Sequence, residues 1–395
     1  MTGAVGPDSD LAARLAERIH RRGPLPFDEW MEAALYDADG GFFARAGGAG
    51  RAGADFLTSV EVGSLFGALV ARAVDRWWDE LGRPDPFLVV DAGAGRGRLA
   101  GDVLRAGPRC AGALRYVLVE RSAALRAAQA EHLPLEPAEL VLGPAVPPEP
   151  DEEPVAVPGS GPVMTSLAEL PGGPVTGVVI ANELADNLPF RIVERGAGET
   201  GWSEIRISEA DGRFAEMAVP ADDGLAAAAD RLVEGSAIRS AARLPVPTGL
   251  SEWLRAAAAM LRRGVVVVVD YAAPVEELAA RGQAGWLRTY RAQDRGGSPL
   301  EAPGCQDITA DVPVEGLRRA AAAAGLAVLT ETTQADWLRS LGVDELVETA
   351  RAAWHGRSAS DLAALGARSR VHEADALLDP TGLGGHRVAV LGQRL

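Results

Sequence analysis

A buried strand that runs directly into a glycine-rich turn and a helix constrains this chain more than any other feature. The strand is the apolar run Phe87 to Asp91, and GAGRGRLAGDVLRAG follows it. Other apolar runs of strand length alternate with helical segments, at 116–120, 175–183, 263–271, 326–333 and 386–392. This alternation is typical of a parallel sheet packed against helices. The sequence predicts an α/β, Rossmann-like fold with a mostly parallel seven-stranded sheet flanked by helices.

Two further regions depart from the alternation. The first 82 residues read as largely helical, and residues 190–250 hold polar and apolar alternation with glycine turns, typical of an antiparallel meander. Residues 272–312 lack strong periodicity, which favours a lid. We therefore expect an N-terminal helical region at 1–82, a core at 83–190 and 262–395, and an inserted β-rich or lid subdomain at 191–261. The third strand of the sheet is expected at LVLGP, residues 140–144.

The spacing of the glycine turn discriminates between nucleotide-like ligands. A dinucleotide fingerprint requires glycine at position 98, where the chain has Arg98, and the absence of GK[ST] excludes a phosphate-binding P-loop. The pattern acid-x-Gly-x-Gly-x-Gly instead resembles the first motif of class I S-adenosylmethionine-dependent methyltransferases. That resemblance assigns Asp91 to the cationic methionine end of the cofactor. It places Gly93, Gly95 and Gly97 around the ribose and methionyl chain, because glycine permits close backbone approach.

A second acid supports a ribose-containing ligand. Glu120 ends the second strand, at a point where one carboxylate can accept both ribose hydroxyls. A solvated acid at a strand end is the alternative interpretation. Arg121 is assigned to the cofactor side with it, whereas capping of the next helix suffices for Ser122.

After the fourth strand, the segment ANELADNLPF extends the resemblance to the MidA family, which includes a mitochondrial arginine methyltransferase needed for complex I assembly. Blocks in the family order cover nearly the whole chain: PFDEWMEAALYDADGGFF, DFLTSVEVGSLFG, VVVVDYA, QDITADV and GLGGHRVAVLG. The chain departs from the family pattern at Ala272, Trp286 and Ala292, so the lid and the substrate are less constrained than the cofactor.

The resemblance implies S-adenosyl-L-methionine as cofactor and a protein arginine as methyl acceptor. Guanidinium stays protonated in water, with a pKa above about 12, so carboxylates must hold its geometry. Glu183 is the first candidate for that catalytic role and Asp186 the second. Asn182 is expected to orient the substrate or the cofactor amine, and Glu204 matches another acidic family position. Helix capping is the alternative for Glu183 and Asp186.

The segment DFLTSVEV adds candidates that resemble the family's cofactor-covering block. Thr58 and Glu61 are assigned to the cofactor side, whereas capping of the next helix explains Ser59 well. Asp55 and Ser59 belong to the same polar cluster.

Composition limits the partners and the location. The net charge of −16 argues against nucleic acid and suits a cationic substrate or basic partner. Two cysteines and scattered histidines predict no disulfide framework and no metal site. The chain has neither a signal-peptide core nor an apolar run long enough for a membrane helix, so we expect a cytoplasmic protein. Trp77 and Trp78 are interpreted as packing residues, with a homodimer contact as the alternative.

Three functions remain open from the sequence. The first is a protein arginine methyltransferase, and the second is a small-molecule N- or O-methyltransferase on the same scaffold. The third is a non-catalytic cofactor-binding assembly factor. The intact Asp91, Glu120 and Glu183 argue against lost cofactor binding, but they do not separate the first two functions.

Overall fold

The structure is a computed structural model and describes residues 7–44, 58–143, 159–198, 201–238, 241–291, 294–354 and 362–392. The chain forms two compact units. We call the first the core unit; it comprises Leu57–Glu183, Ala257–Val269 and Leu326–Leu395. The second, the accessory unit, comprises Met1–Phe56, Leu184–Ala256 and Asp270–Gly325.

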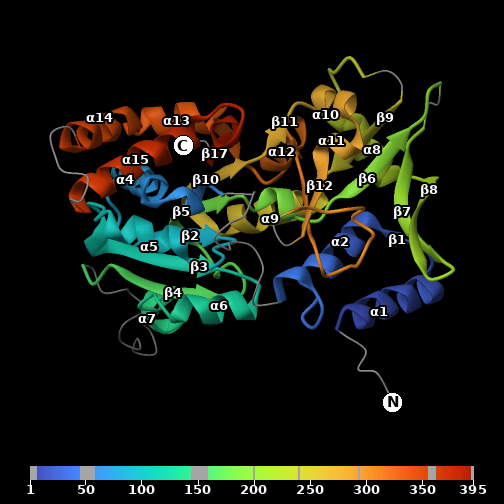
Figure 1. The fold of residues 1–395 in the computed structure, drawn as a ribbon, viewed down its shortest axis with the longest axis horizontal. Coiled ribbons are helices and arrows are strands. Elements are labelled where there is room, and N and C mark those ends of the chain that lie inside the picture. Colours follow the sequence, from blue (N-terminus) through green and yellow to red (C-terminus); the bar gives the residue numbers. More distant parts are fainter. Residues whose placement is uncertain are drawn as a thin grey trace. The chain divides into compact units, whose positions relative to one another are not determined.

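A seven-stranded sheet forms the centre of the core unit (Figure 1). Its order is β16 (Ala327–Thr333), β17 (Arg387–Gly392), β10 (Leu261–Asp270), β5 (Val175–Asn182), β2 (Phe87–Ala92), β3 (Leu114–Val119) and β4 (Val163–Leu167). The neighbouring pairs from β10 to β4 are parallel, whereas β16 and β17 are antiparallel. The predicted α/β class with seven strands is confirmed, and the sheet is mixed.

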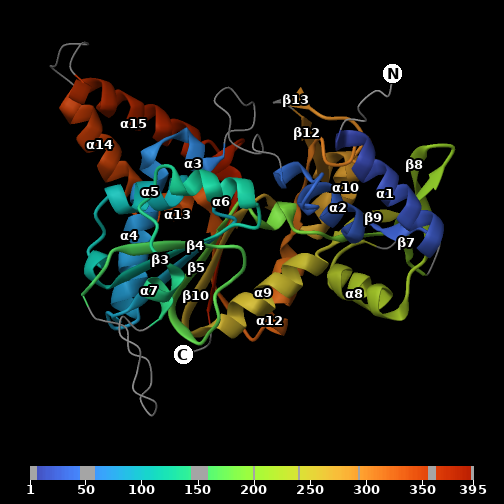
Figure 2. The same cartoon turned by 90° about the horizontal axis from the view of Figure 1, so that it is seen from below.

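Helices cover this sheet because its strands are apolar on both faces. Val89, Tyr116 and Ile180, which share one face, are buried in one cluster with residues of α4, α13, α14 and α15. Figure 2 shows these helices together on the core unit. Trp77 belongs to this cluster and Trp78 packs against it, as expected for packing residues. The helices of the unit are α3 (Ser59–Val62), α4 (Ser64–Glu80), α5 (Arg98–Arg105), α6 (Ala123–Ala130), α7 (Ala138–Leu142), α13 (Gln334–Ser340), α14 (Val343–Trp354) and α15 (Leu362–Leu378).

The third strand of the sheet lies elsewhere than predicted. Residues 138–142 form the helix α7, which follows Pro137 at its N-cap, and residues 144–158 lie outside the described ranges. The edge strand is β4, in which Met164 is buried and pairs in register with Tyr116. The prediction at 140–144 was wrong because proline at a helix start fixes a favourable φ. A five-residue apolar run alone does not separate helix from strand.

An antiparallel sheet organises the accessory unit. Its order is β1 (Leu25–Pro26), β7 (Ser203–Ala210), β6 (Arg191–Arg195) and β9 (Ala242–Val246), and β8 (Arg213–Pro220) also pairs with β7. The predicted meander is therefore present at β6, β7 and β8. Two smaller sheets join β11 (Ala272–Ala273) to β15 (Val312–Pro313), and β12 (Leu287–Arg291) to β13 (Asp294–Arg295) and β14 (Asp307–Ala310). The helices are α1 (Pro7–Arg22), α2 (Phe27–Tyr36), α8 (Asp223–Val233), α10 (Val275–Arg281), α11 (Gln283–Trp286) and α12 (Val314–Ala323). Helix α9 (Thr248–Met260) belongs to this unit as far as Ala256 and to the core unit from Ala257.

The units cut across the three parts expected from the sequence. The described residues among 1–56 group with those of 184–256 and 270–325, whereas α4 belongs to the core unit. Tertiary contacts explain the difference. Trp30 is fully buried, its indole N–H donates to the Pro299 carbonyl at 3.1 Å, and its ring lies 4.7 Å from that of Phe214. Trp286, expected in a lid, is a buried residue of the same core; Ala272 starts β11, and Ala292 lies outside the described residues.

No helix among the described residues has both the length and the hydropathy that a membrane crossing requires.

Candidate active site

The glycine turn after β2 is held at the carboxyl ends of two neighbouring strands. Gly93, Gly95 and Gly97 have φ values of 72°, 54° and 77°, in the left-handed region that favours glycine. The N–H groups of Gly93 and Ala94 donate to the carbonyl of Val119, the last residue of β3, at 2.9 and 3.1 Å. The turn thus lies where ligands of open α/β sheets bind.

The glycines of this turn serve two different purposes. A Cβ at Gly97 would meet Leu133 Cδ1 at 2.5 Å and Leu118 Cδ2 at 2.7 Å, so Gly97 is required for packing under α5. A Cβ at Gly95 would meet no atom within 4 Å, so Gly95 borders open space. Gly93 is also exposed. The turn therefore offers accessible backbone to a ligand on a tightly packed base.

Glu120 is held by the glycine turn and by Ser122, the N-cap residue of α6. It is only 9% exposed; its Oε2 accepts the Gly95 N–H at 2.9 Å and its Oε1 accepts the Ser122 N–H at 2.9 Å. Burial raises the pKa of Glu120, and these backbone hydrogen bonds oppose that shift. Each carboxylate oxygen can accept more than one hydrogen bond. Glu120 can therefore still accept hydroxyl donors, as a ribose requires.

Sequence analysis missed Gln129, which supports the same turn. Its side chain is fully buried, and its Nε2 donates to the Gly95 carbonyl at 2.6 Å. Ser166 of β4 donates through its hydroxyl to the Gln129 Oε1. The one sequence signal was a polar residue four positions after Leu125, on the buried side of α6.

Asp91 is a buried acid at the end of β2. It is 3% exposed, and its Oδ2 accepts the Tyr116 hydroxyl at 3.2 Å. Burial raises the pKa of Asp91 to about 7. No described cation lies within ion-pair distance of it, so a cationic ligand group nearby would favour the charged form.

Glu183 follows β5 in a backbone conformation that is uncommon for its residue type. Its φ is 51°, its N–H donates to the Val269 carbonyl at 2.8 Å, and its Oε1 accepts the Ser59 N–H at 2.7 Å. Asn182 Nδ2 donates to the same oxygen at 3.4 Å. Asn182 Oδ1 is buried and accepts no hydrogen bond from the described part of the chain. Non-glycine residues in the left-handed region cluster at functional sites. Glu183 is such a residue, and the polar residues Asn182 and Ser59 both contact it.

The remaining cofactor-side candidates show more ordinary contacts. Thr58 and Glu61 form a capping box at the start of α3, in which the Thr58 N–H donates to Glu61 Oε2 at 3.5 Å. Ser59 Oγ donates to Gln334 Oε1 at 2.9 Å. Arg121 is exposed after β3, and Asp55 lies outside the described residues.

The other two catalytic candidates lie in the accessory unit and hold its segments together. Asp186 is buried in η3 (Ala185–Asn187), accepts the Thr309 hydroxyl, and has its pKa raised to about 6 mainly by burial. Glu204 is fully buried, and its Oε1 and Oε2 accept hydrogen bonds from Arg191 Nε and Arg206 Nε, each at 2.7 Å. Both carboxylate oxygens of Glu204 therefore already have arginine partners.

The residues at the strand ends fit S-adenosyl-L-methionine. Glu120 offers acceptors to ribose hydroxyls, and the glycine backbone leaves room beside them. The buried Asp91 and the Asn182 Oδ1 supply acceptors for a cationic amino acid end. Within the described ranges no group of histidine, cysteine and acidic side chains could hold a metal ion.

Comparisons with known proteins agree with this fit. A family model of S-adenosyl-L-methionine-dependent methyltransferases matches residues 69–332. "Protein arginine methyltransferase NDUFAF7 homolog, mitochondrial" from Drosophila melanogaster is 28% identical over 80% of this chain and 70% of its own. "Protein arginine methyltransferase NDUFAF7, mitochondrial" from Danio rerio is 25% identical over 95% of this chain and 85% of its own.

A solved structure extends the similarity over the full length. It is a superfamily member from Burkholderia thailandensis bound to S-adenosyl-homocysteine, 28% identical, with a TM-score of 0.76. The match covers 100% of this chain and 94% of that one. The fold, the strand-end residues and these matches together show an enzyme that uses S-adenosyl-L-methionine, and the chain belongs to the MidA family of S-adenosyl-L-methionine-dependent methyltransferases.

Proposed function

We propose that this methyltransferase acts on an arginine side chain of a protein partner. The names of the relatives from Drosophila melanogaster and Danio rerio support an arginine acceptor in a protein. The net charge of −16 also suits a basic partner segment, because complementary charge speeds association. The names of these relatives include the word mitochondrial. The cytoplasmic location that the sequence predicts for this chain stays a prediction.

The observation that carries the proposal is the conformation of Glu183. A left-handed φ of 51° disfavours a residue with a Cβ, yet the chain keeps glutamate there rather than glycine. The Ser59 N–H and the Asn182 amide both donate to Oε1, which fixes the carboxylate relative to β5. A carboxylate fixed in this way matches the forked donors of a guanidinium.

The bound cofactor supplies a methyl group on a positively charged sulfur. In our proposal, Glu183 accepts two N–H bonds of the guanidinium and aligns the attacking nitrogen at about 3 Å from the methyl carbon. As the new N–C bond forms and the C–S bond breaks, that nitrogen loses a proton, and the Glu183 carboxylate is placed to accept it. Before that proton transfer, the Glu183 carboxylate stabilises the charge of the protonated guanidinium.

The supporting roles follow from the contacts. We assign Asp91, Gly93, Gly95, Gly97 and Glu120 to cofactor binding, with Asn182 oriented toward the cofactor amine. We also assign Thr58, Glu61 and Arg121 to the cofactor side. We assign Asp186 and Glu204 a structural role within the accessory unit, because each is already bound to side chains of that unit.

Transfer of a labelled methyl group tests the acceptor. The purified chain is incubated with methyl-labelled S-adenosyl-L-methionine and a lysate of its host, and the lysate is then separated into protein and small-molecule fractions. We expect label in protein and methylarginine after acid hydrolysis. Label that enters only the small-molecule fraction would support the alternative N- or O-methyltransferase, and no label with intact cofactor binding would support a non-catalytic assembly factor.

A variant pair tests the role of Glu183 in the same assay. Glu183→Gln is expected to lower transfer at least about 100-fold, because the amide loses the charge and the proton acceptor, while cofactor affinity changes little. Glu169→Gln, which changes an exposed acid of the core unit, should retain full transfer. Full activity of Glu183→Gln would remove this residue from the mechanism.

A further inference from the structure

A cavity of about 340 Å³ lies within the accessory unit, where three helices meet. It is bordered by the end of α8, the start of α9 and the outer turns of α12. Its apolar lining includes the buried side chains of Leu232, Val246 and Ala320. This volume falls in the range of small-molecule sites.

Small residues keep the cavity open. A Cβ at Gly316 would meet Pro247 Cγ at 2.8 Å, so glycine permits the close approach of α12 to the start of α9. Ala228, Ala320 and Ala323 then line the space with methyl groups only. The backbone of α12 thus packs closely against the start of α9, while the volume between the side chains of the three helices remains unfilled.

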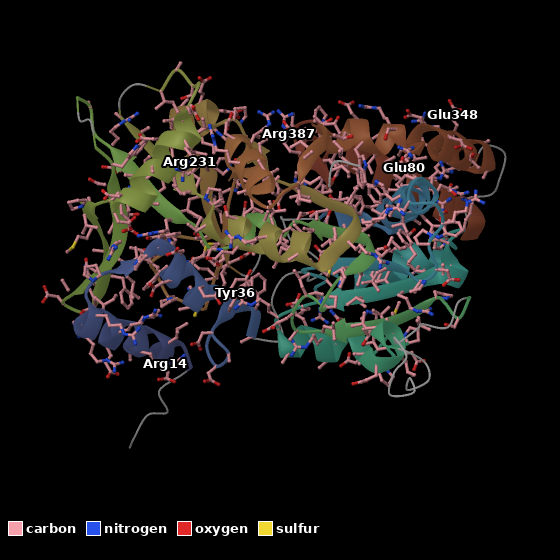
Figure 3. The ribbon with its side chains drawn as sticks, turned by 180° about the vertical axis from the view of Figure 1, so that it is seen from behind. Arg14, Tyr36, Glu80, Arg231, Glu348 and Arg387 are labelled. Carbon is pink, nitrogen blue, oxygen red and sulfur yellow. The ribbon has the colours of Figure 1, made fainter. Side chains whose placement is uncertain are left out.

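Three arginines, one from each helix, border this apolar space. Arg319 is half-buried and forms an ion pair with Glu234 at 2.9 Å. Arg231 and Arg255 are exposed, and neither side chain makes an ion pair or hydrogen bond within the described ranges; Figure 3 labels Arg231 on α8. Glu252 also lines the cavity and pairs with none of these arginines within 4 Å. Three cations against Glu234 and Glu252 leave one net positive charge.

The local charge is opposite in sign to that of the whole chain, which carries 55 acidic against 39 basic residues. Some arginines, such as Arg109 and Arg243, lie within ion-pair distance of two acids. Arg231 and Arg255 instead border an apolar cavity without an acidic partner among the described residues, which makes them candidates to bind an anion there. The hydroxyl of Ser251, which also lines the cavity, already donates to the Pro247 carbonyl at 3.0 Å, so the arginines are the donors that remain for an anion.

We propose that this cavity binds a small organic monoanion with an apolar body, of the chemical class of medium-chain carboxylates. The guanidinium groups of Arg231 and Arg255 bind the carboxylate, because guanidinium and carboxylate match in geometry and charge. The apolar body occupies the space over Leu232, Val246 and Ala320. The cavity lies wholly within the accessory unit, and none of its lining residues belongs to the strand-end site.

Calorimetric titration of the intact chain with octanoate, butyrate and octanamide tests both halves of the proposal. Octanoate is expected to bind one to one. Butyrate should bind at least about tenfold more weakly because it buries less apolar surface, and octanamide at least about tenfold more weakly because it lacks the charge. Equal affinity for octanoate and butyrate, or for octanoate and octanamide, would overturn the proposal.

Variants assign the binding to this cavity. Arg231→Gln with Arg255→Gln should weaken octanoate binding at least about tenfold, whereas the charge-conserving Arg231→Lys with Arg255→Lys should weaken it less, because the charge is kept and only the forked geometry is lost. Arg351→Gln, which removes an exposed cation of the core unit, is the matched control and should leave affinity unchanged. All of these side chains are exposed, so the melting temperature should not move. Absence of octanoate binding, or unchanged affinity in the Gln double variant, would refute the site.

Discussion

The backbone N–H of Gly95 donates a hydrogen bond to the Glu120 carboxylate across 2.9 Å. This contact joins the turn after β2 to the acid after β3, which are 25 positions apart in the sequence. The Ser122 N–H fixes the second carboxylate oxygen. The Glu120 carboxylate is therefore oriented before any ligand binds, which would lower the cost of binding a ribose in the proposed role.

Glu120→Gln is expected to weaken S-adenosyl-L-methionine binding by about 10- to 100-fold, since a hydrogen bond to a charged group contributes roughly 1.5–3 kcal/mol. The amide nitrogen would also face an N–H donor of the chain. Calorimetric titration measures the loss, and Glu131→Gln, an exposed acid next to α6, is the control. Affinities within twofold of each other would show that Glu120 does not bind the ribose.

Gly97→Ala and Gly95→Ala should separate folding from binding. The new Cβ at position 97 would press on Leu118 and Leu133, so we expect the free energy of unfolding to fall by about 2–4 kcal/mol from overpacking and backbone strain. At position 95 only the strain remains, about 1–2 kcal/mol, and the larger effect should be on cofactor affinity. Urea unfolding and calorimetry of both variants give the comparison. An equal loss of stability in the two would contradict the packing difference.

The pH dependence of stability should report the burial of Asp91. An acid whose folded-state pKa is about 7, against 3.8 in the unfolded chain, holds its proton more tightly when folded. Its contribution to stability is therefore complete below the unfolded value and is lost as the pH rises through the folded value. Between those two pKa values, the free energy of unfolding of Asp91→Asn should fall less with rising pH than that of the natural chain. The difference should reach roughly 1–3 kcal/mol near neutral pH.

Urea unfolding at a series of pH values checks this expectation. Asp294→Asn, which alters an exposed acid, should keep the slope of the natural chain. Identical slopes for Asp91→Asn and the natural chain would mean that Asp91 stays ionised in the folded protein.

Glu204→Gln should act through stability rather than through chemistry. The substitution leaves Arg191 and Arg206 without their shared carboxylate, and breaking a buried ion pair typically costs about 3–5 kcal/mol. We expect a large drop in the unfolding free energy, with transfer activity per folded molecule largely retained at low temperature. Asp222→Asn, which removes the exposed second partner of Arg191 at 3.5 Å, should have a small effect. Normal stability with abolished transfer would assign Glu204 to the reaction itself.

Local patterns in the sequence predicted the features that depend on neighbouring residues. The glycines at 93, 95 and 97 require positive φ wherever they occur in such a turn, and long apolar runs such as 265–269 form buried strands in most contexts. For this reason the seven-strand sheet and the glycine turn after β2 could be inferred, whereas the five-residue edge strand β4 could not.

Features that depend on distant contacts were not predictable. The bond between Gln129 and the Gly95 carbonyl forms only once α6 packs beside the turn. The arginine pair around Glu204 assembles from two strands of the meander. The alternation of polar and apolar residues indicates which side chains face the interior, but it does not indicate which residues they contact. The two arginine partners of Glu204 could therefore not be inferred from the sequence.

The two residues of β1 carry a consequence for evolution and for engineering. Leu25 and Pro26 pair with Ile207 and Arg206 of β7, beside the stretch of β7 that pairs with β6. A segment near the amino terminus thus completes a sheet encoded some 180 positions later. Exchange of the meander between relatives should yield a foldable chimera only when residues 1–56 are inherited with it as a matched set.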